Sequence, residues 1–130
     1  MSKYKLSDLS IERLDTCRDD IQRVIKRAIE ITNHDFMVVC GGRGEEDQNK
    51  AYREGNSKKR YPNSKHNKIP SLAVDVCPCK GKTLLWEDYE AWAYVIGAIM
   101  QAANELGIKV KWGGNWKTYR GDFPHFEGEG

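Results

Sequence analysis

Three side chains that can bind a metal ion lie in three separate segments of this chain. His66 lies mid-chain, Asp75 follows nine residues later, and His125 lies near the C-terminus. Two imidazoles and one carboxylate can hold a zinc ion and leave a fourth position open for water, as catalytic zinc sites do. Asp122, three residues before His125, offers a carboxylate that can act as a base. A set of this kind is typical of zinc hydrolases, and it requires a fold that brings the three segments together.

The length and composition of the chain fit one small domain. A chain of 130 residues can bury a core without disulfide bonds, so we expect a single domain over residues 1–130. Hydrophobic residues make up 39% and charged residues 31% of the chain, which is ordinary for a globular domain. The formal net charge of +2 is too small to indicate a polyanionic partner by itself.

No segment of the sequence predicts export or membrane insertion. The N-terminus lacks an apolar stretch of signal-peptide length, and no stretch is long and apolar enough to span a bilayer. We therefore expect the protein to be made in the cytoplasm, and any route out of it to be supplied by another component.

The chain has four cysteines, none in paired CxxC motifs: Cys17, Cys40, Cys77 and Cys79. Thiolates of Cys77 and Cys79, directly after Asp75, would compete for zinc, because sulfur is a strong zinc ligand. The favoured interpretation is that Cys17 and Cys40 are small buried apolar side chains and that the other two are reduced thiols on a loop surface.

The hydrophobic pattern predicts helices followed by short strands. We expect helices over residues 11–31, 45–54 and 86–106, the last capped by Gly107, and strands over 36–40, 72–76, 108–112 and 123–127. Residues 56–71 are polar and basic and predict a long surface loop. Helices with a small antiparallel sheet define an α+β fold.

Two spacings constrain the geometry of the candidate ligands. His66 and Asp75 have Pro70 between them, so they cannot share one regular strand. The loop 67–71 must instead bring His66 over the strand that carries Asp75. Asp122 and His125 would point to opposite faces of a regular strand, so their convergence requires a bend, for which Pro124 provides a cause.

Five short motifs occur in order along the chain: Gly42-Arg43-Gly44-Glu45-Glu46-Asp47-Gln48, Ser64-Lys65-His66, Ala73-Val74-Asp75, Trp112-Gly113-Gly114-Asn115-Trp116 and Asp122-Phe123-Pro124-His125-Phe126-Glu127. Together they resemble the zinc peptidases that include phage L-alanyl-D-glutamate endolysins, bacterial D-Ala-D-Ala carboxypeptidases and the dipeptidases of vancomycin resistance. The likeness is strongest to the single-domain phage endolysins and runs from Ser10 through Glu127. It implies the hedgehog-like fold of the zinc D-Ala-D-Ala peptidases.

The resemblance also implies roles for individual residues. It makes His66, Asp75 and His125 the ligands of a Zn2+ cofactor and Asp122 the general base. It implies that Arg43 steadies the polarised carbonyl oxygen; without the resemblance, Arg43 would read as a surface partner of Glu45 or Glu46.

Two further residues are implied to bind substrate. Ser64, in the serine-x-histidine motif, would help to line the substrate cleft, and Trp112 would form part of its wall. The chain departs from many members in two places. The interval between His66 and Asp75 is longer, and Gly44 replaces the usual hydroxyl residue at a helix start.

The implied substrate is the stem peptide of peptidoglycan, and the implied reaction is hydrolysis of its L-Ala–D-Glu bond by a monomeric endolysin. The protein would then act on the cell wall after release from the host cytoplasm. A D-Ala-D-Ala carboxypeptidase or dipeptidase is the alternative, because both use the same zinc chemistry.

Two other classes compete with this interpretation. Non-haem iron oxygenases also use two histidines and one carboxylate, but those sites usually lie in all-β barrels, and this chain has too few predicted strands. A nucleic-acid-binding module would use the basic residues 58–60 with Trp112, Trp116 and Tyr119 as stacking platforms. We favour a solvated basic loop and expect no nucleic-acid partner.

Overall fold

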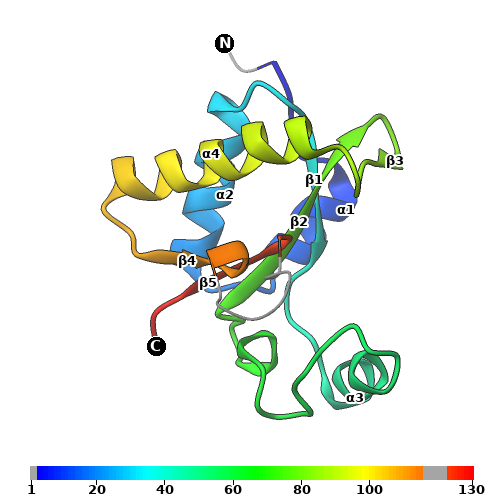
Figure 1. The fold of residues 1–130 in the computed structure, drawn as a ribbon. Helices are drawn as coiled ribbons and strands as arrows, with labels where there is room; N and C mark the ends of the chain where they lie inside the picture. The colour runs from blue at the N-terminus through cyan, green and yellow to red at the C-terminus, as the bar shows by residue number, and fades with distance from the viewer. Residues whose placement is uncertain (1–2, 116–122) are drawn as a thin grey trace.

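The computed structural model describes residues 3–115 and 123–130 and confirms the α+β fold class (Figure 1). Its helices and strands follow in the order α1 (Asp8–Leu14), α2 (Asp19–Ile31), β1 (Phe36–Cys40), α3 (Glu45–Arg53), η1 (Lys65–Asn67), β2 (Ala73–Lys80), β3 (Thr83–Leu84), α4 (Tyr89–Leu106), β4 (Val110–Trp112), η2 (Gly113–Asn115) and β5 (His125–Gly128). Among these described residues, no helix is long and apolar enough to cross a bilayer.

The strands form one antiparallel sheet in the order β1-β2-β5-β4, with β3 paired to β2. β2 is therefore central, and its residues alternate between two faces. Val74 and Val76 point into the hydrophobic core, which they share with Phe126 of β5. Asp75 points to the opposite face. Figure 1 shows α2 and α4 crossing one side of the molecule, with α3 at the end far from α4.

The single helix predicted over residues 11–31 is wrong, because the chain breaks between Leu14 and Asp19 into α1 and α2. The break is caused by a contact distant in sequence. The amide N–H of Arg18 donates to the carbonyl oxygen of Ser71 at 2.8 Å, and the Ser71 amide donates to that of Thr16 at 2.9 Å. Cys17 and Ser71 form an isolated parallel bridge. Amphipathic spacing continues across the break, so the sequence pattern alone did not reveal it.

The cysteine prediction also needs correction. All four thiols are free, and Cys17 is buried as predicted. Cys77 and Cys79, however, lie buried within β2, which extends to Lys80 rather than ending at Val76. Pro78 lies between them and does not end the strand, although its backbone has no N–H to donate.

The register of the sheet places three polar side chains in one row. Cys40 of β1 lies opposite Asp75 of β2, which in turn lies opposite His125 of β5. Side chains directly opposite each other in antiparallel strands share a face. The row therefore presents a thiol, a carboxylate and an imidazole on the face away from the core.

Candidate metal centre

His66 is held on the short 3-10 turn η1, which follows the long loop after α3. Ser64 caps this turn, because its Oγ accepts a hydrogen bond from the His66 amide N–H at 3.2 Å. Asn67 completes the cap, since its Oδ1 accepts from the Ser64 amide N–H at 3.0 Å. The His66 carbonyl accepts from the Arg43 amide N–H at 2.8 Å. These bonds fix the backbone that directs the His66 side chain, which is only 3% exposed, over the sheet.

The side chains of His66, Asp75 and His125 meet at one point. Nε2 of His66 lies 3.3 Å from Oδ1 of Asp75 and 3.3 Å from Nδ1 of His125. Nδ1 of His125 lies 3.2 Å from the same carboxylate oxygen. The loop before β2 thus brings His66 over the strand that carries Asp75, as predicted. Three donor atoms from three segments form a nearly equilateral triangle.

The outer nitrogens of both imidazoles have partners that fix the ring orientations. Nδ1 of His66 lies 2.8 Å from the Gly41 carbonyl oxygen, which can only accept, so this nitrogen carries the hydrogen. Nε2 of His125 lies 2.8 Å from Oε1 of Glu127. Lys65 holds the other oxygen of that carboxylate, with Nζ at 3.0 Å from Oε2. In the neutral tautomers, both rings therefore present a lone pair toward Asp75, as metal-bound histidines do.

The charges at this point favour a cation. Oδ1 of Asp75 is buried and has no hydrogen-bond partner among the described residues. Burial opposes charge on His66, yet its contacts with Asp75 and Cys40 raise its pKa to about 10. Burial likewise opposes charge on His125, and Asp75 and Glu127 raise its pKa. The two rings also hold the pKa of Asp75 well below its usual range, against the effect of burial. This group of side chains thus stabilises positive charge, whether a proton or a metal ion carries it.

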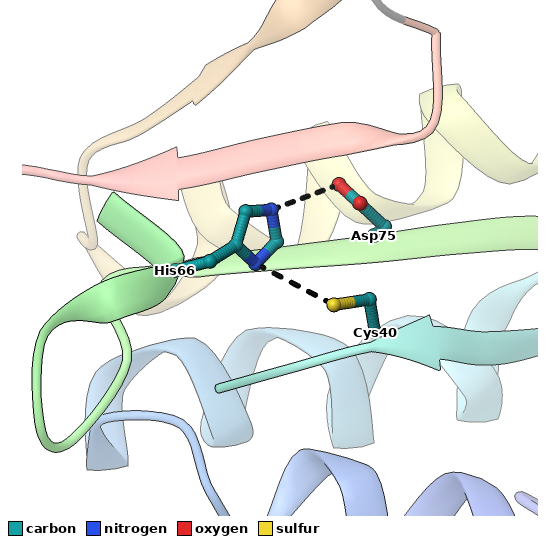
Figure 2. Close-up of side chains that lie close together, drawn as sticks. All are labelled: Cys40, His66 and Asp75. Carbon is teal, nitrogen blue, oxygen red and sulfur yellow. Dashed lines mark hydrogen bonds and ion pairs between the residues drawn. The ribbon is translucent and has the colours of Figure 1, made fainter. Parts of the chain in front are cut away.

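Cys40 offers a competing ligand set. The ligand atoms of Cys40, His66 and Asp75 lie within 4.8 Å of one another, so these three residues could also hold a metal ion. Figure 2 shows the His66 ring between the other two side chains, with one nitrogen facing each. The nitrogen nearest the Cys40 sulfur is Nδ1, at 3.9 Å, and it is the one engaged with Gly41. The set with His125 is tighter, with donor separations of 3.2–3.3 Å, and it uses the ring nitrogens that face Asp75, so we favour it.

Cys40 itself differs from its prediction as a buried apolar side chain. It is half-buried and lies in the row of the site, with Nη2 of Arg43 at 3.4 Å from its sulfur. The register shift between Val38 and Cys40 aligns Cys40 with Asp75, and nothing in the local sequence indicates it.

Arg43 lies at the edge of the metal centre. Its Nη2 is 3.6 Å from Oδ2 of Asp75, and the guanidinium side chain is 16% exposed. Its Nη1 donates to Oε1 of Gln48 at 3.0 Å. Arg43 therefore pairs with a candidate ligand rather than with the neighbouring glutamates of α3. The arrangement leaves a positive charge next to the point where the three donor atoms meet.

The remaining predicted site residues lie in different settings. Ser64 is buried and acts as the cap of η1. Trp112 is half-buried, packs against the hydrophobic core, and donates from Nε1 to the Phe123 carbonyl at 2.9 Å. It thereby supports the segment just before His125. The substrate-binding roles of Ser64 and Trp112 stay predictions. Asp122, the predicted base, lies outside the described residues, as do Trp116 and Tyr119.

Two residues of the site were missed from the sequence. Glu127 follows His125 by two residues, and strand alternation places both side chains on one face, so its role could have been inferred. Gln48 is a fully buried polar residue on α3 that contacts Arg43. Gln48 ends the first of the five motifs, but no role was inferred for it, because its position on a polar helix does not indicate that it is buried.

Comparisons with known proteins identify the family of this chain. A model of the phage L-alanyl-D-glutamate peptidase family matches residues 1–127. The L-alanyl-D-glutamate peptidase of Escherichia phage T5 is 33% identical over 120 residues, which cover 92% of this chain and 86% of that protein. The crystal structure of the Serratia marcescens L-Ala D-Glu endopeptidase ChiX aligns with a TM-score of 0.82 and 33% identity, covering 98% of this chain and 92% of that one. The chain is therefore a member of the phage L-alanyl-D-glutamate peptidase family.

Proposed function

We propose that this protein is a zinc-dependent peptidoglycan peptidase that hydrolyses the L-Ala–D-Glu bond of the stem peptide. The observation that carries the proposal is the triangle of Nε2 of His66, Oδ1 of Asp75 and Nδ1 of His125, with sides of 3.2–3.3 Å. The named activities of the two relatives support the choice of bond.

The donor separations support zinc as the metal. Nitrogen and oxygen ligands lie about 2.0–2.1 Å from zinc, so two ligands of a tetrahedral ion are about 3.3 Å apart. The three measured separations match this value. Two neutral imidazoles and one carboxylate leave one tetrahedral position open, which is the composition of catalytic rather than structural zinc sites.

The chemistry follows from the residues around this position. When bound, zinc supplies a water that ionises near neutral pH, with a pKa of roughly 7. Arg43 directs its positive charge at the same group of side chains and would stabilise the negative charge that develops on the carbonyl oxygen of the scissile bond. Asp122 would accept a proton from the attacking water and return it to the leaving amine. The role of Asp122 rests on its place in the motif that ends in His125.

Digestion of purified peptidoglycan, followed by mass spectrometry of the fragments, tests the proposed bond. We expect new peptides that begin with D-Glu and glycan strands that keep L-Ala. Chelation should abolish the reaction, and added zinc should restore it. Release of free D-Ala alone would assign the protein to the carboxypeptidase branch instead.

We also propose that the protein acts as a monomer on the cell wall after release from the cytoplasm in which it is made. One domain of 130 residues carries all three candidate ligands, so the site needs no second copy to be complete. Size-exclusion chromatography with light scattering should give a mass near 14.9 kDa. An active dimer without active monomer would contradict this part of the proposal.

A further inference from the structure

Gln48 is a polar side chain that is fully buried in a helix whose other residues are exposed or half-buried. α3 carries it at the end of the molecule where η1 and the loop after α3 also lie. A buried amide is costly unless its donors and acceptor are all engaged. The partners of Gln48 therefore indicate what this residue does.

The two ends of the Gln48 amide face different parts of the molecule. Its oxygen, Oε1, accepts from Nη1 of Arg43 at 3.0 Å and from Nδ2 of Asn67 at 3.2 Å. Its nitrogen, Nε2, donates to Oγ of Ser57 at 2.9 Å and to the carbonyl oxygen of Lys59 at 2.6 Å. The partners of the oxygen, Arg43 and Asn67, lie beside the metal centre and on the turn that carries His66. The partners of the nitrogen, Ser57 and Lys59, lie in the loop after α3. Every hydrogen-bonding position of the amide is thus used.

The oxygen end holds two groups that surround the metal centre. Arg43 has one guanidinium nitrogen on Gln48 and the other 3.6 Å from Oδ2 of Asp75. Asn67 donates from the same Nδ2 to the Arg43 carbonyl oxygen at 2.9 Å, and its Oδ1 completes the cap of the turn that carries His66. Gln48 therefore connects the side chain of Arg43 to the turn of His66 through one buried oxygen.

We propose that Gln48 is a positioning residue that fixes the guanidinium of Arg43 against the metal centre. An arginine side chain has several rotatable bonds, and ordering it costs conformational entropy. A buried acceptor on Nη1 removes that freedom before substrate binds, so the charge of Arg43 is already in place when the carbonyl oxygen becomes negative. This inference rests on the proposed function, because it assigns Arg43 its role in hydrolysis.

The competing explanation is that Gln48 only ties α3 to the loop around Ser57 and Lys59. Both explanations predict a less stable protein when Gln48 is replaced. They differ in the cause of the lost activity: only the positioning role makes this loss depend on Arg43. A double-mutant cycle between Gln48 and Arg43 separates them, because residues that act through one another give non-additive effects.

The cycle uses Gln48→Met, which keeps the length of the side chain and removes both polar ends. Hydrolysis of a synthetic stem peptide containing L-Ala–D-Glu gives kcat and KM for each protein. We expect Gln48→Met to lower kcat by about 10- to 100-fold, with KM within a few-fold of wild type and zinc content unchanged. Arg43→Ala should lower kcat by about 10²- to 10³-fold. The double variant should be no more than a few-fold worse than Arg43→Ala alone.

Two further variants separate the contacts of the Gln48 oxygen from those of its nitrogen. Ser57→Ala removes a partner from the loop end only and should leave kcat within about two-fold of wild type, since the Arg43 contact is untouched. Gln48→Glu keeps an oxygen for Arg43 and Asn67 but loses both N–H donors to the loop, so we expect it to hydrolyse substrate within a few-fold of wild type. If Gln48→Met does not fold, this expected activity of Gln48→Glu remains as the test of the positioning role.

The outcomes distinguish this inference from the proposed function. Effects of Gln48→Met and Arg43→Ala that multiply, or a loss in Gln48→Glu above about tenfold, would overturn the positioning role while wild-type hydrolysis and its zinc dependence still stand. Full activity of Arg43→Ala would overturn it as well. Failure of the wild-type protein to hydrolyse the stem peptide when zinc is bound would reject the proposed function itself.

Discussion

The two faces of the central strands β2 and β5 are built from alternating residues of the same sequence and are stabilised in different ways. On the core face, Val74, Val76 and Phe126 are buried against other apolar side chains. On the other face, the buried oxygen of Asp75 meets nitrogens of His66 and His125, which carry lone pairs in their neutral tautomers. Apolar packing is favourable by itself, whereas electron-rich atoms at 3.2–3.3 Å require a proton or a metal ion between them. One face therefore supports the fold, and the other carries the proposed metal ligands.

Truncation of the neighbours His125 and Phe126, which point to opposite faces, should have the largest effects and separate the roles of these faces. His125→Ala removes one of the three proposed ligands, so bound zinc and hydrolysis should both be lost. Phe126→Ala leaves the ligands in place and opens a cavity in the core, which should cost about 3–5 kcal/mol of unfolding free energy. Metal analysis, activity and thermal unfolding of both variants check this. Retention of zinc by His125→Ala would show that the ligand set is wrong.

A second test separates a ligand from the proposed base in the same motif. Asp122→Asn leaves all three ligands present, so zinc should stay bound. Loss of general acid–base catalysis should lower kcat by about 10²–10⁴-fold. The measurement is zinc content together with single-turnover hydrolysis. If Asp122 only accepts hydrogen bonds from nearby backbone, Asn keeps an acceptor oxygen, and near-normal hydrolysis by the metal-loaded variant would remove Asp122 from the mechanism.

A smaller effect is expected from the carboxylate behind His125. His125 holds the pKa of Glu127 near 2, and Lys65 contributes in the same direction against burial. Glu127→Gln keeps the size of the side chain but loses the charge that fixes the ring of His125 and strengthens it as a ligand. Partners of this kind contribute about 10–100-fold in metal affinity. Competition with a fluorescent chelator should show a drop in zinc affinity of that size. Lys109→Ala is the control: this lysine lies just before β4, is exposed and pairs with Glu129, so its loss should not change zinc affinity.

The sequence was informative where contacts are local or periodic, and less so where distant segments meet. The end of the helix predicted over residues 86–106 is confirmed, although α4 begins at Tyr89 and not at Trp86. The positive φ of Gly107 at the C-cap is a local property of glycine, so the sequence could predict this end. The break between Leu14 and Asp19 depends instead on backbone bonds to Ser71, which no window of the sequence contains. The resemblance to known peptidases supplied the convergence of His66, Asp75 and His125, because spacing alone left a metal site as one option. The contacts of Gln48 and Cys40 required the folded arrangement.

The smallest effect is expected from the thiols, and it decides between the two ligand sets. If His66, Asp75 and His125 hold the metal, Cys40→Ser should leave one zinc per chain and change kcat by no more than a few-fold, because serine keeps a polar group near Arg43. If Cys40 were a ligand, loss of its sulfur would lower zinc affinity strongly, since thiolates bind zinc well.

Cys77→Ser with Cys79→Ser is the matched control, because both thiols are buried in β2 and burial raises their pKa to about 11 and about 12. That control should cost stability rather than metal, since it places hydroxyl groups among buried side chains. Zinc loss in Cys40→Ser together with zinc retention in His125→Ala would move the metal centre from β5 to β1.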